Sequence, residues 1–171
     1  MRGLSFNRNE PKAFILAVDG AFAAFDPDND QVWALNLEST HAYPFCLQTT
    51  FGLRARSMRL FPRIRINQEH YHDSSRFHCR PTVIQYAPDT LRIECYPIES
   101  LHILFEFFIS GSDTLVGSIR IKNLRKDPLN IILDLASVLV PMGKGIPTRS
   151  EREGVNQIIV GQTNEIWPVL I

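Results

Sequence analysis

The chain has 171 residues, of which 44% are hydrophobic, 10% aromatic and 21% charged, an ordinary composition for a globular protein. This length corresponds to about one domain and is enough to bury a sizeable core. Lys plus Arg and Asp plus Glu number 18 each, so the net charge is zero and the basic excess typical of a nucleic-acid binder is absent.

Three scattered cysteines, Cys46, Cys79 and Cys95, do not form the even set expected of a disulfide framework in a short secreted chain. The N-terminal "MRGLSFNRNEPK" lacks the apolar core of a signal peptide. No apolar run approaches the roughly eighteen residues that span a bilayer. We therefore expect a cytoplasmic protein without nucleic-acid or membrane partners and without a cofactor.

Alternating apolar and polar residues, separated by short polar turns such as "VDGA", "APDT" and "GQTN", predict an all-β protein. The expected fold is an antiparallel β-sandwich of stacked sheets with little or no helix, forming one domain over residues 1–171. The predicted strands cover 13–18, 21–25, 31–37, 46–66, 80–87, 91–97, 101–110, 114–124, 127–141, 155–161 and 164–170.

Two early features have a functional and a structural interpretation. The acidic "DPDND" at 26–30 resembles the opening of a calcium loop, but Gln31 and Leu37 stand where an EF-hand has Gly and Glu. Trp33, Tyr43 and Trp167 could stack on sugar rings, although core packing is the commoner fate of such side chains. Trp33 is retained as a candidate ligand contact.

The most unusual stretch is "FGLRARSMRLFPRIRI" at 51–66. Its apolar residues change from odd to even positions near Arg56 and Ser57, which predicts a β-bulge or a sharp corner in a strand. With that change of phase, all five arginines lie opposite the apolar side. They are Arg54, Arg56, Arg59, Arg63 and Arg65.

These arginines allow two interpretations. They can form a solvated, ion-paired side of a strand, since isolated surface charges contribute little. They can also form a docking or ligand surface, because guanidinium groups suit carboxylates, phosphates and sugar hydroxyls. We take Arg54, Arg56, Arg59 and Arg63 as candidate contacts to a ligand or to another domain.

The segment "HYHDSSRFHC" at 70–79 gathers histidine, aspartate and cysteine side chains that could bind zinc. It is a weak candidate for a metal site, because the spacing of these residues matches no standard zinc site. Cys46 or Cys79 beside a histidine could suggest a nucleophile, but nothing indicates a perturbed thiol. The glutamates of the central strands show no pairing suited to acid/base catalysis. The sequence therefore predicts neither catalytic residues nor a metal site.

The central strands have the clearest pattern. Leu91, Ile93 and Cys95 face one side of 91–97, and "SGSD" at 110–113 predicts a β-hairpin over 101–124. In that hairpin Ile119 and Ile121 are expected to point inward. The next segment, "DPLNIILDLASVLVP" at 127–141, could be a helix with Asp127 as its N-cap or a strand pairing with 114–124. Its β-branched residues favour the strand.

The order of "QVWALNLES", "LQTTFGLRARSMRLFPR" and "LRIECYPIESLHILFEFFISGSDTLVGSIRIKNLRKDPLNIILDLASVLVPM" resembles the N-terminal β-sandwich domain of bacterial glycogen-debranching, amylo-α-1,6-glucosidase-like proteins. Related domains precede the catalytic barrel of cellobiose phosphorylase and other glucan-acting enzymes. The likeness covers roughly residues 31–141 and includes a hairpin strand ending in Asn123. "GLRARSMRLFPR" is its most specific part.

This resemblance implies stacked antiparallel sheets, a strand at 127–141 and a following (α/α)₆ barrel that supplies the catalytic carboxylates. The chain is too short to contain such a barrel and ends in the apolar "NEIWPVLI", so we expect the N-terminal part of a longer glycoside hydrolase. No catalytic residue can be carried over from the family.

Three functions are therefore weighed. The first is a non-catalytic domain that braces the catalytic barrel and can help to line an oligosaccharide cleft. It requires an exposed apolar patch where the barrel docks. The second is a stand-alone carbohydrate-binding or homo-oligomer-forming sandwich. The third, an enzyme within this chain, requires a pocket with convergent carboxylates or a metal.

Overall fold

The computed structural model describes residues 13–17, 32–37, 43–50, 54–111, 114–143, 146–153, 156–162 and 168–170. These ranges form strands and one short 3₁₀ helix, and they contain no α-helix. Every strand pair among them is antiparallel. The prediction of an all-β antiparallel fold is confirmed.

The largest sheet has six strands in the order β1-β2-β3-β4-β10, with β5 also paired to β4. β4 is its centre, because β10 runs along one edge of β4 while β3 and β5 share the other edge. The strands are β1 (Ala13–Ala17), β2 (Val32–Asn36), β3 (Cys46–Thr49), β4 (Ala55–Ile66), β5 (Glu69–Tyr71) and β10 (Ile131–Pro141).

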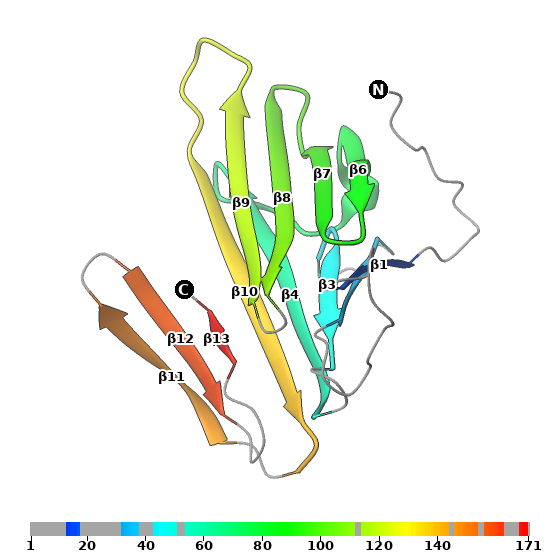
Figure 1. Cartoon of the computed structure of the whole chain (residues 1–171). Coiled ribbons are helices and arrows are strands. Elements are labelled where there is room, and N and C mark those ends of the chain that lie inside the picture. Colours follow the sequence, from blue (N-terminus) through cyan, green and yellow to red (C-terminus); the bar gives the residue numbers. More distant parts are fainter. Residues whose placement is uncertain are drawn as a thin grey trace.

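A four-stranded sheet in the order β6-β7-β8-β9 packs in front of the six-stranded sheet (Figure 1). A three-stranded sheet, β11-β12-β13, lies beside β10 (Figure 1). The strands are β6 (Cys79–Ala87), β7 (Thr90–Tyr96), β8 (Leu101–Gly111), β9 (Thr114–Asn123), β11 (Ile146–Glu153), β12 (Asn156–Gln162) and β13 (Val169–Leu170).

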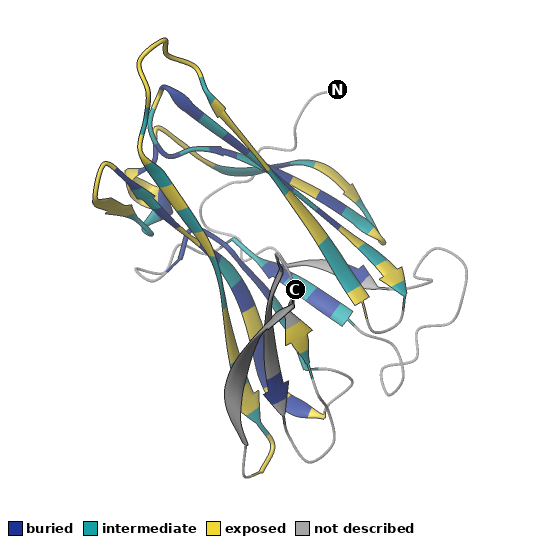
Figure 2. Ribbon diagram, turned by 90° about the vertical axis from the view of Figure 1, so that its left-hand side faces the viewer, coloured by how far each residue is buried: buried dark blue, intermediate teal, exposed yellow. Residues whose placement is uncertain are grey.

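The core lies between the six-stranded and four-stranded sheets. Phe45, directly before β3, meets Phe105 of β8 edge to face, with ring centroids 4.9 Å apart. Buried and exposed residues alternate along the strands of both sheets (Figure 2). Burying a side chain of this size stabilises the fold by about 1.5–3 kcal/mol. The stacked sheets of the predicted sandwich are therefore present.

The segment 46–66 is not one strand, as predicted, but two. β3 folds back on β4, so that Leu47 lies opposite Leu60, and the Ala55 N–H donates to the Thr50 carbonyl at 2.9 Å. Period-two alternation gives the side of each residue but not the partner of the strand. A hairpin and one bent strand therefore show the same alternation of apolar and polar residues, and the sequence does not distinguish them.

The predicted bulge is confirmed. Val140 pairs with Ser57 and Pro141 with Ala55, so Arg56 is the extra residue on β4. Beyond it, Met58, Leu60, Ile64 and Ile66 are buried while Arg59 and Arg63 are exposed. One inserted residue thus accounts for the change of phase in the sequence.

The helix considered for 127–141 is wrong, because 131–141 is strand β10. The pairing considered for it, with 114–124, is also wrong, since β10 pairs with β4. The connection at 124–130 carries the chain from one sheet to the other, and Asn130 is held there by Asn67, whose N–H donates to the Asn130 carbonyl at 3.0 Å. Because the chain crosses from the four-stranded to the six-stranded sheet at this point, the inward side chains of β10 pack on the core.

Among the remaining predictions, the β8–β9 hairpin and the buried row of Leu91, Ile93 and Cys95 are confirmed. Ile121 lies on the inward side, opposite Ile103, but 42% of it is exposed because β9 is an edge strand. β5 and β11 were not predicted, and the last strand is shorter than expected. The predicted strand 21–25 lies outside the described residues.

Candidate functional site

The outward side of β4 and β10 is the candidate site, and we call it the arginine face. Alternation along both strands brings its members together, because β4 and β10 pair over their whole length. Its members are Arg56, Arg59, Phe61, Arg63 and Arg65 of β4 with Ile132, Asp134, Ala136, Val138 and Val140 of β10. Arg54, in the turn before β4, is exposed beside them.

One arginine of this face has an ion pair with a described residue of the same face. Arg63 Nη2 lies 3.3 Å from Asp134 Oδ2, and the two side chains are 61% and 51% exposed. An ion pair this open to water contributes about 0–1 kcal/mol. For Arg56, Arg59 and Arg65, no ion pair with another described residue occurs. Much of the positive charge is therefore available for an external partner.

Aromatic and apolar groups lie beside these cations. The rings of Tyr43 and Phe61 are tilted by 34° to each other with centroids 4.9 Å apart, and this contact holds Phe61 in place between Arg59 and Arg63. On β10, Ile132, Val138 and Val140 remain 40%, 45% and 38% exposed. Apolar side chains next to arginines are typical of protein contact surfaces.

Trp33, the remaining candidate contact, lies in the core and is only 3% exposed. A ring so covered offers no face for a sugar. Its position on β2, opposite Leu16 of β1, explains the burial, because this side of the six-stranded sheet faces the four-stranded sheet. The structure therefore corrects the assignment of Trp33 as a surface contact.

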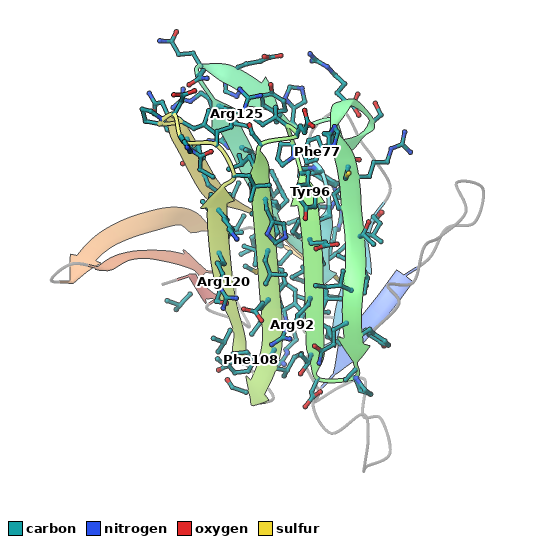
Figure 3. The ribbon with its side chains drawn as sticks, turned by 90° about the horizontal axis from the view of Figure 1, so that it is seen from above. Phe77, Arg92, Tyr96, Phe108, Arg120 and Arg125 are labelled. Carbon is teal, nitrogen blue, oxygen red and sulfur yellow. The ribbon has the colours of Figure 1, made fainter. Side chains whose placement is uncertain are left out.

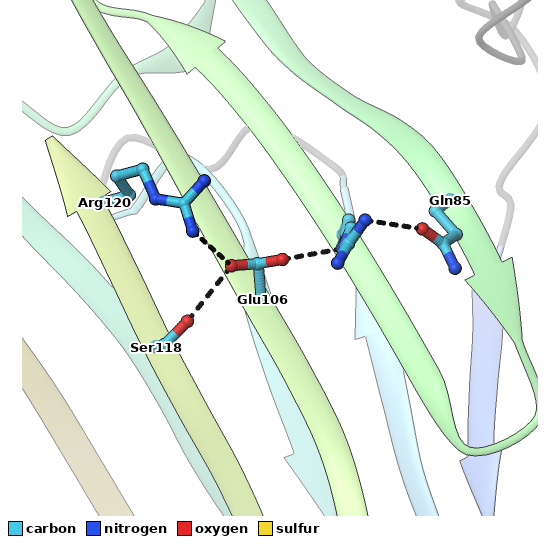
Figure 4. A network of polar contacts seen from close by, with 5 residues as sticks. Gln85, Glu106, Ser118 and Arg120 are labelled. Carbon is cyan, nitrogen blue, oxygen red and sulfur yellow. Dashed lines mark hydrogen bonds and ion pairs between the residues drawn. The ribbon is translucent and has the colours of Figure 1, made fainter. Parts of the chain in front are cut away.

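The outer side of the four-stranded sheet provides a contrast, because two of its arginines have the same acidic partner within the sheet (Figures 3 and 4). Glu106 Oε1 lies 2.7 Å from Arg92 Nε, and Glu106 Oε2 lies 3.6 Å from Arg120 Nη2. Ser118 Oγ donates to Glu106 at 3.3 Å, and Arg92 Nη1 donates to Gln85 Oε1 at 2.9 Å. Each of these two arginines therefore has an acidic partner within the sheet, although Phe108 of the same strand as Glu106 is 45% exposed.

A second pair occupies the same side. His102 Nε2 lies 3.4 Å from Glu94 Oε2, and the imidazole stacks on the Tyr96 ring with centroids 4.9 Å apart. Glu94 and Glu106 are thus engaged in contacts within the sheet rather than converging on a pocket. They do not form an acid/base pair.

The histidine-rich segment 70–79 is arranged around a short turn. Asp73 Oδ1 accepts the Ser75 N–H at 2.8 Å and begins the 3₁₀ helix η1 (Ser74–Arg76). Arg76 Nη2 lies 3.2 Å from Glu69 Oε1, which ties this turn to β5. Within the described ranges, no group of three His, Cys, Asp or Glu side chains is placed to hold a metal ion. The calcium-like 26–30 lies outside those ranges.

The cysteines are free thiols with different environments. Burial raises the pKa of the Cys95 thiol far above its usual value, and the neighbouring Glu94 carboxylate adds to the effect. Burial also raises the pKa of Cys46, partly offset by a backbone hydrogen bond at Leu60 and by the charge of Arg59. Thiols held in the protonated form are poor nucleophiles. Cys79 is exposed.

Sequence reasoning found the arginines but missed the exposed side chains of β10 that complete the face. The sequence did contain a sign of these side chains. "IILDLASVLV" is apolar at almost every position, a pattern typical of a strand whose two sides are both covered. What the pattern could not reveal was that β4 is the neighbour of β10.

No protein family, curated protein or solved structure matches this chain significantly. In the part of the chain that the structure describes, no helix is long and apolar enough to cross a membrane.

Proposed function

We propose that this chain is a non-catalytic β-sandwich domain that braces the catalytic (α/α)₆ barrel of a glycogen-debranching-like glycoside hydrolase. The contact surface in this proposal is the arginine face. The assignment to carbohydrate metabolism depends on the resemblance over residues 31–141, whose most specific stretch, "GLRARSMRLFPR", contains most of β4. With three free cysteines and no disulfide between them, a reducing cytoplasm is part of the proposal.

The observation that carries the docking role is the difference between the two outer sides of the sandwich. On the four-stranded sheet, Arg92 and Arg120 both pair with Glu106. On the arginine face, cations lie beside Ile132, Val138 and Val140, which stay exposed. A surface with cations and exposed apolar side chains together is complementary to a partner with acidic and apolar groups.

The test measures association of this protein with a separately produced (α/α)₆ barrel of a debranching-like enzyme from the same organism, by isothermal titration calorimetry. The variant Arg56→Gln/Arg59→Gln removes two charges from the arginine face. Lys122→Gln/Lys126→Gln removes two exposed charges elsewhere and is the matched control. We expect the first pair to weaken association about tenfold or more, which corresponds to about 1.4 kcal/mol, and the control pair to leave it unchanged.

Raising the salt concentration to about 0.5 M should weaken the same association, since the Debye length falls to a few ångströms. No association of the parent protein at low salt, or an equal loss in both pairs, would refute docking through this face.

A second candidate, direct binding of oligosaccharide by a stand-alone module, is favoured by the Phe61 ring lying between Arg59 and Arg63. Titrating a branched maltooligosaccharide into the protein without the barrel separates the two functions. Binding that is lost in Phe61→Ala supports the sugar-binding module, and the absence of binding removes it.

A further inference from the structure

The uncovered part of the arginine face is a narrow strip over β4 and β10. On β10, Val138 is 45% exposed. On β3 the same side of the sheet is already covered, because Cys46, whose thiol lies close enough to Arg59 to feel its charge, is only 1% exposed. Tyr43 packs there against Phe61 and is itself buried. The strip that remains open is therefore about two strands wide.

This width fits a helix better than a second sheet. Strands lie about 4.8 Å apart, so two of them make a strip of about 10 Å, and a helix with its side chains is about 10–12 Å across. A packed sheet would cover several strands at once. The outward residues next to Arg59 on β3 and β2 are Gln48 and Ala34, which offer such a sheet no large apolar side chain.

The composition of β10 points to the same kind of cover. Its near-continuous apolar run is typical of strands in sheets that helices cover. The three-stranded sheet does not supply this cover, because Gly161 approaches Leu139, an inward residue that packs on the core. On the outward side Ile132 and Val140 remain 40% and 38% exposed.

We propose that the arginine face binds one amphipathic helix on the surface of the partner barrel, lying along β4 and β10, with acidic side chains on one flank and apolar side chains on the other. From Ser57 to Arg65 the strand pair is about 27 Å long, the length of a helix of about 18 residues. This inference rests on the proposed docking function and names the element that the partner contributes.

The two rows of the face assign the two flanks of the helix. The β4 row carries the arginines, and the β10 row opposite them is mainly aliphatic. Arg63 and Arg65 are about 6.6 Å apart along the strand, close to the 6 Å between helix residues i and i+4. Carboxylates one turn apart therefore meet these two arginines, and a third about two turns further on meets Arg59. Arg59 and Arg65 form no ion pair with a described residue that this contact would have to break.

Asp134 gives the proposal a consequence of opposite sign. It is the single acidic residue of the arginine face, and its carboxylate pairs with Arg63. A carboxylate at this position repels an acidic flank and competes for Arg63. Asp134→Asn should therefore strengthen binding of the helix about threefold, whereas Arg59→Gln should weaken it by a similar factor. Lys122→Gln, which removes an exposed charge from β9, should change nothing.

Fluorescence anisotropy with a stapled helical peptide of about 18 residues tests the chemistry of the occupant. The probe carries glutamates at i, i+4 and i+11 on one flank and leucines on the neighbouring flank. The control peptide has the same residues distributed evenly around the helix. We expect a Kd of about 0.1 mM for the probe and binding of the control at least about tenfold weaker. No binding of the probe, equal binding of both peptides, or weaker binding by Asp134→Asn overturns the proposal.

Photo-crosslinking in the complex with the barrel tests the helix in the partner itself. A benzoylphenylalanine replaces Ile132 in one variant and Val138 in another, two outward positions about 20 Å apart on β10. Mass spectrometry should find the two crosslinked partner residues about 13 positions apart on one helix. Crosslinks to loops or to separate helices overturn this inference and leave docking intact. Binding of the peptide without association of the barrel overturns the proposed function instead.

Discussion

Alternate residues of β7 have opposite environments, and Cys95 shows the consequence most clearly. It is fully buried beside Ile93, and burial raises the pKa of its thiol above the unfolded value. A group that ionises less readily in the folded state stabilises the fold fully at pH values below its unfolded pKa. That contribution is lost as the pH rises above this value, because the unfolded chain then releases a proton that the folded chain keeps.

We therefore predict that the free energy of unfolding falls as the pH rises above about 8.5, by up to about 1.4 kcal/mol per pH unit for this thiol. Urea unfolding of the parent protein and of Cys95→Ala at several pH values from neutral to alkaline checks this. The parent should lose more stability than the variant over the alkaline range. Parallel pH profiles of the two proteins would show that Cys95 does not contribute.

A second residue-scale feature is the two-residue turn between β4 and β5. Asn67 and Gln68 have φ values of 48° and 73°, the left-handed region that non-glycine residues rarely adopt. Both central residues of a type I′ hairpin turn need such angles, and Asn tolerates them better than Gln. Asn67 is further held by the main chain of Asn130.

Gln68→Gly should therefore stabilise the protein by about 0.5–1 kcal/mol, because glycine adopts positive φ without steric cost. Denaturant unfolding measures the change, with Gln68→Ala as the control that keeps the Cβ. If glycine were no better than alanine, the turn would not be under the strain that its angles indicate.

At the scale of the element, the bulge in β4 decides which side of the sheet each residue of the strand faces. Arg56 is inserted between Ala55, opposite Pro141, and Ser57, opposite Val140. Removing Arg56 would leave a regular ladder in which Ala55 and Ser57 keep their present sides. Removing Arg59 would instead shift one half of the strand by a residue, and a shift of one residue exchanges its two sides.

Deletion of Arg56 is thus expected to preserve the fold with a loss of about 1–2 kcal/mol, whereas deletion of Arg59 should abolish cooperative unfolding. Circular dichroism and thermal unfolding of the two deletion variants distinguish these outcomes. Loss of the fold in both would mean that the bulge is required for the structure, contrary to this interpretation.

At the scale of the whole molecule, the three-stranded sheet meets the six-stranded sheet through a close approach at Gly161. A Cβ added there would lie 3.1 Å from Leu139 Cδ2 of β10 and 3.2 Å from Pro168 Cγ. Both distances are tighter than ordinary van der Waals contacts. Glycine is therefore needed at this point of β12 for the sheet to approach β10.

Gly161→Ala should destabilise the protein by about 1–3 kcal/mol through overpacking, and by less in a Leu139→Ala background. A double-mutant cycle from denaturant unfolding gives the coupling energy between the two positions. Strictly additive effects would show that the three-stranded sheet does not press on Leu139 in solution.

Period-two alternation alone determined much of this protein: its all-β class, the buried row of β7, the β8–β9 hairpin and the bulge that keeps the arginines on one side. These are local properties, because the side of each strand residue follows from its neighbours in sequence. The resemblance that suggested a glycan-acting enzyme remains a prediction.

Tertiary structure decided which strands are neighbours. It divided 46–66 into a hairpin, sent 131–141 across to β4, buried Trp33 and placed Ile132, Val138 and Val140 beside the arginines. A strand exposes the same backbone donors and acceptors to any partner, so its neighbour is chosen by packing over the whole core. For that reason the arginines could be found in the sequence, while the surface they share with β10 required the fold.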